Sequence, residues 1–136
     1  MSILKNLMPA TVIACSCFAA PSAHALDARS HAASDEAFAG VPGKEAQMIT
    51  VDYRPGSVDP IHRHDAHAFV YVLEGSIVKQ LKGGKEVTLT PGQTFHEGPN
   101  DVHVVGRNAS STKPAKFLVV FVKKEGAPIL TVEQSE

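Results

Sequence analysis

From residue 46 onward, hydrophobic and β-branched residues recur in short runs that are separated by turn-forming residues. The runs read AQMITVDY, PIHRH, AFVYVL, SIVKQL, EVTLT, QTFHE, VHVVGR and AKFLVVFV. Gly, Pro, Asn and Asp gather in the breaks between them, and no sustained helical period appears in this part of the chain. Short β-rich runs at even spacing predict an all-β, single-domain fold over residues 46–123, an antiparallel jelly-roll or barrel.

One hairpin can be placed within this pattern. The segment SIVKQLKGGKEVTLT has two β-rich runs of similar length on either side of a Gly-Gly pair. Glycine adopts the positive φ angles that tight hairpin turns require. The pattern therefore predicts a hairpin with Gly83 and Gly84 at its tip.

The segments that flank the β-rich region look different. Residues 26–45 are Ala-rich and lack a sustained apolar period. They are expected to form a loose N-terminal arm that becomes ordered only near Phe38 or Val41. Residues 124–136 are expected to form a solvated C-terminal tail.

The first 25 residues have the pattern of a bacterial-type signal peptide. Lys5 precedes an apolar run that ends in Ala23-His24-Ala25, with small residues at the two positions a signal peptidase reads. The run is too short for a comfortable membrane span of about 20 residues. We expect cleavage after Ala25 and a periplasmic or secreted protein that is not held at the membrane. A lipobox-like sequence before Cys15 offers the alternative of a lipoprotein anchored at that residue.

Composition excludes some functional classes. The chain has 13 Lys and Arg against 14 Asp and Glu, a formal net charge of −1. A nearly neutral chain gives no reason to expect a nucleic-acid partner. Both cysteines lie in the expected signal peptide, so the mature protein would have no disulfide.

The chemistry-bearing residues are histidines, and five of the seven fall between positions 62 and 103. Residues i and i+2 of a strand point to the same face, so His62 and His64 should project together and Arg63 should project away. Two imidazoles on one strand face give two nitrogen ligands for a metal ion. A third ligand has to come from another strand.

The spacing around these histidines resembles the two sequence motifs of the cupin superfamily. The positions that match the first motif are Gly56, His62, His64, Ala68 and Gly75. The positions that match the second motif are Gly92, Gly98, Asn100, His103 and, one place late, Asn108. The resemblance covers residues 46–123.

The resemblance implies a small β-barrel with a divalent metal ion near its centre. His62, His64 and His103 match the family's three histidine ligands. Fe, Mn, Zn, Ni and Cu all remain open as the metal, because three imidazoles suit several of them.

Besides the shifted Asn108, the chain departs from the family pattern at two positions. Ala68 stands where the family usually has Glu, and alanine cannot coordinate a metal. His67, His96 and Glu97 are the nearby candidates to replace that carboxylate; Glu97 is also a candidate general base if its strand points it inward. Asn100 stands where the family has a turn Gly, and Asn tolerates the left-handed conformation.

Three functions are compatible with these observations. The first is a metal-dependent enzyme that acts on a small organic molecule, with oxygenase, isomerase, decarboxylase or lyase chemistry. The second is a non-catalytic module that binds a small ligand or a metal. The third is a barrel whose histidines are merely packed. We also expect a homodimer, because the run FLVVFV and the N-terminal arm are available to cover an exposed sheet edge.

Overall fold

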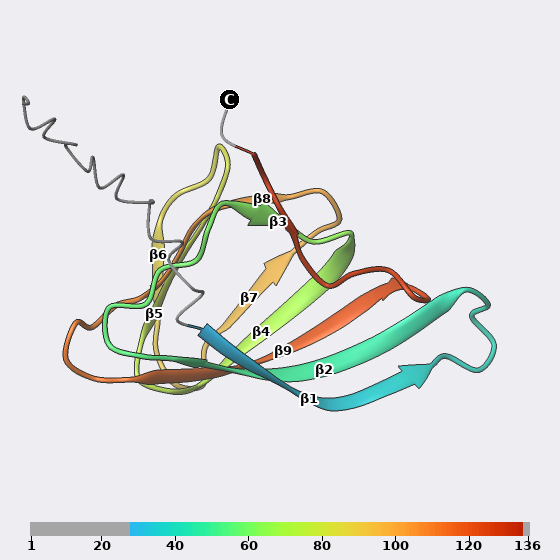
Figure 1. The fold of residues 1–136 in the computed structure, drawn as a ribbon, viewed down its shortest axis with the longest axis horizontal. Coiled ribbons are helices and arrows are strands. Elements are labelled where there is room, and N and C mark those ends of the chain that lie inside the picture. The colour runs from blue at the N-terminus through green and yellow to red at the C-terminus, as the bar shows by residue number, and fades with distance from the viewer. Residues whose placement is uncertain (1–27, 135–136) are drawn as a thin grey trace, which may run out of the picture.

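The computed structural model describes residues 28–134, which form two antiparallel five-stranded sheets and contain no helix (Figure 1). The first sheet has the order β1 (Ala28–Ala37), β2 (Lys44–Tyr53), β9 (Ala115–Lys124), β4 (Ala66–Glu74) and β7 (Thr94–Glu97). The second has the order β10 (Thr131–Val132), β3 (His62–Arg63), β8 (Val102–Asn108), β5 (Ile77–Leu81) and β6 (Val87–Leu89). Within the described residues no helix is long and apolar enough to cross a membrane.

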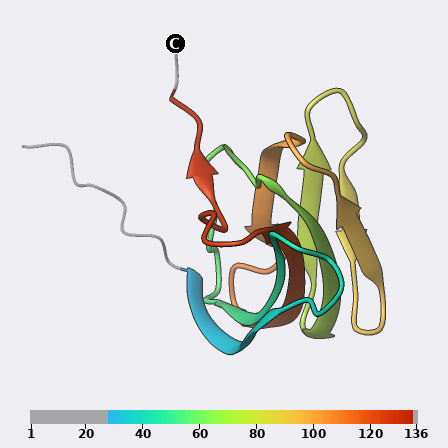
Figure 2. The same ribbon diagram turned by 90° about the vertical axis from the view of Figure 1, so that its right-hand side faces the viewer.

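The two sheets face each other and enclose the core between them (Figure 2). The expected all-β, antiparallel architecture is therefore confirmed. It consists of two facing sheets that are not joined into one closed barrel.

Strict alternation along the strands decides which side chains enter the core. In β4, Ala68, Val70 and Val72 are buried, while Phe69 and Tyr71 on the other face are exposed. Side chains two residues apart share a face, so one strand supplies a packed inner row and a solvated outer row. Each fully buried large apolar side chain of this kind contributes about 1.5–3 kcal/mol.

The N-terminal arm is more ordered than its composition suggests. Residues 28–37 form β1, which pairs antiparallel with β2 from Ala28 opposite Tyr53 to Ala37 opposite Glu45. Pairing at a sheet edge uses backbone N–H and C=O groups, which an Ala-rich segment supplies without any apolar period. The expectation of a loose arm was wrong for this reason.

The apolar run FLVVFV was expected to be available at a sheet edge. It lies instead in β9, which pairs with β2 on one side and with β4 on the other. Both sides of β9 are therefore occupied within the sheet, and β1 takes the edge position.

The turn predictions hold. Gly83 has a φ of 81° between the paired strands β5 and β6, and the N–H of Gly84 donates to the carbonyl of Leu81 at 2.9 Å. Asn100 has a φ of 69°, the left-handed conformation that glycine would otherwise supply.

The C-terminal residues pair with the sheet, while both residues of β10 stay exposed to solvent. β10 pairs with β3, with Val132 opposite His62, and the N–H of Glu133 donates to the carbonyl of Ile61 at 2.9 Å. At the start of this segment the buried Lys123 donates to the carbonyl of Ala127 at 2.8 Å. The segment therefore lies against the strand that carries His62.

Gly75 is a position where we expect substitution to be costly. Its φ is 69°, and an added Cβ would lie 2.4 Å from the carbonyl oxygen of Pro114. We expect Gly75→Ala to lower the free energy of unfolding by about 3 kcal/mol or more, since backbone strain and a steric clash add together. Denaturant unfolding measures this change.

Gly83→Ala is the matched control for this substitution. Gly83 also has a positive φ, but an added Cβ there meets no atom within 4 Å. It should cost only the backbone penalty of about 1–2 kcal/mol. Equal losses in the two variants would show that the contact with Pro114 is unimportant.

Candidate metal centre

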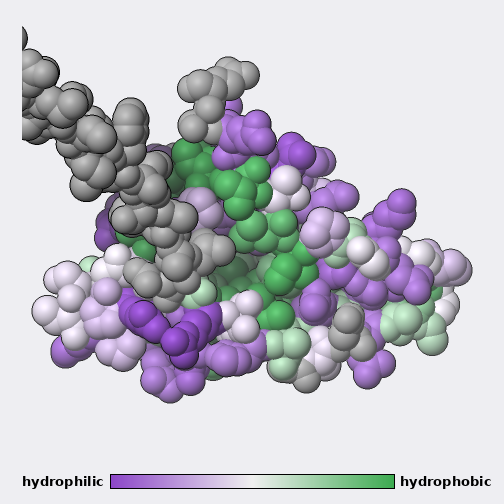
Figure 3. Space-filling view, viewed as in Figure 1, coloured by the Kyte–Doolittle hydropathy of each residue, from purple (hydrophilic) through white to green (hydrophobic). Residues whose placement is uncertain are grey.

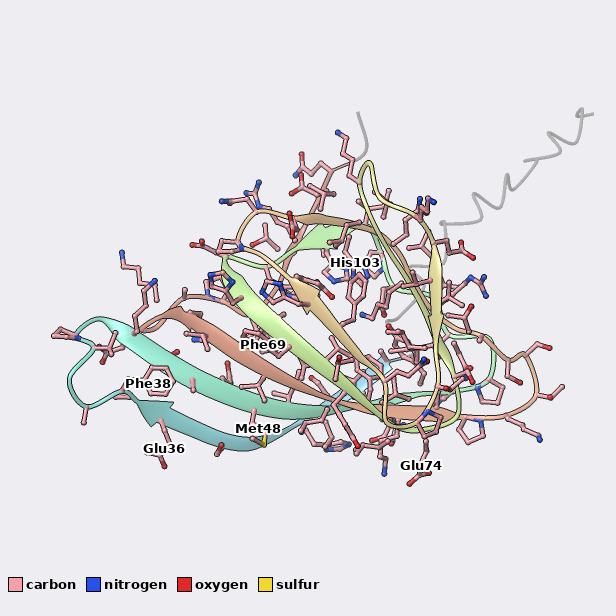
Figure 4. The ribbon with its side chains drawn as sticks, turned by 180° about the vertical axis from the view of Figure 1, so that it is seen from behind. Glu36, Phe38, Met48, Phe69, Glu74 and His103 are labelled. Atoms are coloured by element: carbon pink, nitrogen blue, oxygen red, sulfur yellow. The ribbon has the colours of Figure 1, made fainter. Side chains whose placement is uncertain are left out.

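Three histidines meet in the space between the sheets. β3 and β8 are paired so that His62 lies directly opposite His103, and His64 follows His62 on the same face. All three are buried, with exposures of 3% for His62, 7% for His64 and 1% for His103. Figure 4 shows His103 in the interior of the molecule. Arg63 points the other way and forms an ion pair with Glu133 at 3.4 Å.

The imidazole rings are close to one another. The centre of the His62 ring lies 4.9 Å from the centre of the His64 ring and 4.8 Å from the centre of the His103 ring. Nε2 of His62 and Nδ1 of His103 are 3.2 Å apart. The pairing of the two strands thus places side chains that are 41 residues apart in the sequence next to each other.

Hydrogen bonds to the backbone determine which ring nitrogens carry protons. Nδ1 of His62 donates to the carbonyl of Pro60 at 2.8 Å, and Nδ1 of His64 donates to the carbonyl of Ile129. In the neutral rings, Nε2 then keeps its lone pair. The Nε2 atom of His62 accepts from Nδ1 of His103, which leaves the lone pair on Nε2 of His103. Backbone carbonyls that orient histidines in this way are typical of metal-binding rings.

Burial keeps His64 and His103 neutral. Desolvation, followed by the charge of Lys79, lowers the pKa of His103 to about 2. Desolvation also lowers the pKa of His64. A metal binds the neutral imidazole, so little competition from protons is expected near neutral pH.

A carboxylate that the sequence analysis did not single out lies next to this cluster. Ligand atoms of Asp59, His62 and His103 lie within 4.8 Å of one another, and these residues could hold a metal ion. The hydroxyl of Tyr53 donates to Oδ2 of Asp59. Burial and then the charge of Asp59 raise the pKa of Tyr53, so the phenol stays protonated and remains a donor. Gly106 leaves room for Asp59, because a Cβ there would lie 2.5 Å from Oδ2.

Glu97 faces the interior, and the two other candidates to replace the missing carboxylate face outward. Glu97 pairs with Ala68 across β4 and β7, and each is 1% exposed. Residues directly opposite in an antiparallel pair lie on the same face of the sheet. The Glu97 carboxylate therefore enters the barrel beside the alanine that lacks one. His67 and His96 stack on each other on the outer face, with ring centroids 5.4 Å apart.

Glu97 lies beside the third histidine of the cluster. Its Oε2 is 3.4 Å from Nε2 of His64. Among the described residues, Oε2 of Glu97 and Nε2 of His103 are buried side-chain atoms without a hydrogen-bond partner. Both are acceptor atoms when the groups are in their usual states, and an unpaired buried acceptor is costly. A cation bound beside either atom would satisfy that acceptor.

Lys79 is a second residue that the sequence analysis did not single out. Its side chain is 4% exposed, and Nζ lies 3.8 Å from Oε1 of Glu97 and 5.1 Å from the centre of the Phe117 ring. The sequence does contain a signal for this burial. Lys79 stands two residues after Ile77 in the apolar run SIVKQL, so both side chains lie on the same face of the strand. A lysine at a core position of a strand marks a buried charge.

These side chains line one pocket with a volume of about 140 Å³. Its polar wall comprises Asp59, His62, His64, Lys79 and Glu97. Its apolar wall comprises Ile49, Val51, Val70, Phe117, Val119, Phe121, Ile129 and Leu130, with the last two contributed by the returning C-terminal segment. Figure 3 shows hydrophobic residues gathered around a hollow between the two sheets. The arrangement suits a small molecule with one polar end and an apolar body.

Asn108 has a structural role at the position where the second motif ends. It is buried, and its Nδ2 donates to the carbonyls of Arg54 at 2.9 Å and Lys113 at 2.8 Å. Its Oδ1 accepts from the N–H of Ser110 at 2.9 Å. The amide therefore ties two loops together at the end of the barrel.

Known proteins resemble this chain in sequence and in fold. The chain is 33% identical over 86 residues to auxin-binding protein T85 of Nicotiana tabacum, a match that covers 57% of this chain and 46% of that protein. The chain thus spans about half the length of this relative. A cupin 2 domain-containing protein of Halorhodospira halophila has a TM-score of 0.62 and 18% identity, over 79% of this chain and 71% of that one.

An oxalate oxidase in complex with the substrate analogue glycolate has a TM-score of 0.54 and 24% identity, over 63% of this chain and 45% of that one. At this level of identity the two structural matches show the fold alone. The family model of the cupin domain matches residues 49–121, the stretch that carries both motifs and all three histidines. This chain therefore belongs to the cupin family.

Proposed function

We propose that this protein is a metal-dependent cupin enzyme in which His62, His64, His103 and Glu97 hold one divalent ion beside the apolar pocket. The observation that carries the proposal is the pair of buried, unpartnered acceptors, Oε2 of Glu97 and Nε2 of His103. The backbone hydrogen bond of His64 supports it, because it leaves Nε2 of that ring with a lone pair. Coordination through Nε2 of His62 would replace the hydrogen bond that this atom accepts from Nδ1 of His103.

The chemistry of the donor set fits such an ion. Three neutral imidazoles and one carboxylate suit Fe²⁺, Mn²⁺, Zn²⁺, Ni²⁺ or Cu²⁺, and the donors do not select one of these metals. A divalent ion supplies a Lewis acid with coordination positions for an oxygen atom of a substrate. Glu97 is then available to hold or move a proton beside that oxygen.

The class of substrate is a small organic molecule. The oxalate oxidase that shares this fold is known in complex with glycolate, a small carboxylate. A pocket of about 140 Å³ with a polar end and an apolar wall supports a ligand of similar or slightly larger size.

Metal analysis of the purified full chain tests the proposal. We expect one divalent ion per chain, removable by a chelator and restored by titration. The loaded protein should consume a small organic acid in a panel followed by NMR, and the metal-free protein should not. A stoichiometric metal without turnover of any acid would support the alternative, a non-catalytic binding module. A chain that takes up no ion would contradict both.

Export is the second part of the proposal. The signal-peptide pattern that ends at Ala25 supports a periplasmic or secreted protein. Residues 1–27 lie outside the described residues, so the cleavage site and the lipoprotein alternative at Cys15 rest on sequence alone. N-terminal sequencing of the mature protein should begin at Leu26; a lipidated Cys15 would favour the alternative.

We also propose that the chain forms a homodimer through the outer face of β4. Phe69, Tyr71 and Leu73 lie in one row on that face and are 49%, 44% and 40% exposed. A row of large exposed hydrophobic residues is a common feature of interaction surfaces.

Tyr71→Glu should convert the dimer to a monomer in sedimentation equilibrium. Val58→Glu is the control, because Val58 is also exposed but does not lie in β4. A wild-type protein that is monomeric at every concentration would contradict this assembly.

A further inference from the structure

The pocket holds a buried positive charge that the proposed metal centre does not use. Lys79 follows the buried residues Ile77 and Val78 on β5, and its side chain lines the pocket next to Glu97. A lysine pays a large desolvation cost when it is buried, and is found there mainly when an opposite charge is near.

The internal partner of Lys79 satisfies the ammonium only in part. Nζ lies 3.8 Å from Oε1 of Glu97, which is beyond hydrogen-bond range, while an ammonium has three donors. Oε2 of the same carboxylate lies 3.4 Å from Nε2 of His64 but has no hydrogen-bond partner. With only this distant carboxylate as its ionic partner, Lys79 keeps donor capacity for a second anion.

The rest of the pocket determines what kind of anion fits. The wall opposite the polar residues is apolar and includes Ile49, Val119 and Leu130. An inorganic anion would leave this wall uncovered, whereas an organic acid covers it and brings its carboxylate to the ammonium. A charge-assisted hydrogen bond from an ammonium to a carboxylate is among the stronger polar contacts.

We infer that Lys79 is the anchor that selects a small monocarboxylic acid with an apolar body as the ligand of this pocket. The inference rests on the proposed function, and it names the substrate class of that same site. Lys79 is a positioning and specificity-determining residue, whereas the histidines and Glu97 provide the metal centre.

Benzoate and benzamide form a matched pair of probes, because they have the same shape and differ in charge. Calorimetric titration of the full chain, both metal-loaded and chelator-treated, measures their affinities. Wild-type protein should bind benzoate at least about tenfold more tightly than benzamide, given the strength of one charge-assisted hydrogen bond. Lys79→Met should remove this preference and leave the affinity for benzamide within about twofold.

Three further variants distinguish a specific loss of binding from misfolding. Lys79→Met leaves Glu97 without its lysine, and breaking a buried pair is destabilising. The double variant Lys79→Met/Glu97→Gln is neutral at both positions and should also show no preference for benzoate. Glu97→Gln alone removes the competing carboxylate and should strengthen benzoate binding severalfold in the chelator-treated protein. Lys82→Met, at an exposed lysine just after β5, is the matched surface control and should bind both probes as wild type does.

The inference is overturned if wild type binds the two probes equally, including the case in which it binds neither. It is also overturned if Lys79→Met or the double variant keeps the preference for benzoate. Metal uptake, measured separately, distinguishes this failure from failure of the proposed function. A Lys79-dependent preference for benzoate in a chain that takes up no metal would refute the metal centre and leave the acid anchor standing.

Discussion

His64→Ala is expected to abolish stoichiometric metal binding while the two sheets stay folded. The substitution removes one imidazole donor, whose Nε2 lies 3.4 Å from Oε2 of Glu97. Loss of a single outer partner of a ligand already weakens metal binding by about 10–100-fold, so loss of a ligand should cost at least about 100-fold. Competition with a chelating dye measures the change, and circular dichroism checks that the β-sheet signal is retained.

Two other variants make this result specific. His96→Ala is the matched control, because His96 lies on the outer face, next to Glu97 in the chain, and stacks on His67. It should bind metal as wild type does. Asp59→Asn tests the other carboxylate in the pocket, which Tyr53 already holds by a hydrogen bond. We expect this variant to keep its metal. A His64→Ala protein with full metal content and an Asp59→Asn protein without it would move the centre to Asp59, His62 and His103.

Sequence pattern predicted those features of the site that depend on alternation. His62 and His64 share a face because they are two residues apart on a strand. The same alternation places His67 on the outer face of β4. These relations lie within one strand, so a single sequence is enough to read them. His103 lies opposite His62 through the pairing of β3 with β8, which alternation does not contain; the resemblance to the cupin motifs is what identified it.

The features that pattern did not predict depend on contacts between distant segments. Asp59 joins the cluster because its N–H donates to the carbonyl of Gly106 on another strand, at 2.7 Å. Ile129 reaches His64 because the C-terminal segment returns to pair with β3. Such contacts follow from register and loop path, which periodicity along one strand does not contain. The Ala-rich composition of residues 28–37 also did not predict β1, because its pairing with β2 uses backbone groups.

Glu97 illustrates both cases. The sequence showed that a carboxylate was missing at position 68 and that Glu97 was a candidate, but the direction of its strand was open. The pairing of Glu97 with Ala68 resolves the direction, because directly opposite residues share a face. In the proposed centre, the carboxylate therefore comes from the neighbouring strand, opposite the position where the family usually has it.

The proposed shift of the carboxylate from position 68 to position 97 can be tested by exchanging Ala68 and Glu97. Ala68→Glu alone should lower the free energy of unfolding by about 2 kcal/mol or more, since it overfills a packed position and sets two carboxylates opposite each other. Ala68 and Glu97 are both 1% exposed, so neither side chain has solvent into which it can turn. Glu97→Ala alone should instead weaken metal binding, because no carboxylate then remains in this part of the pocket.

The double variant Ala68→Glu/Glu97→Ala restores one alanine and one glutamate to the pair. The side-chain volume and the charge of the pair are conserved, and swaps of this kind are tolerated far better than single changes. We expect its unfolding free energy to lie within about 1.5 kcal/mol of wild type and its metal affinity to recover most of what Glu97→Ala loses. Denaturant unfolding in the presence of chelator gives the first quantity, and metal titration gives the second. A double variant that is as unstable as Ala68→Glu and as weak in metal binding as Glu97→Ala would show that the two positions do not deliver a carboxylate to the same place, and Glu97 would then lose its assignment as the substitute ligand.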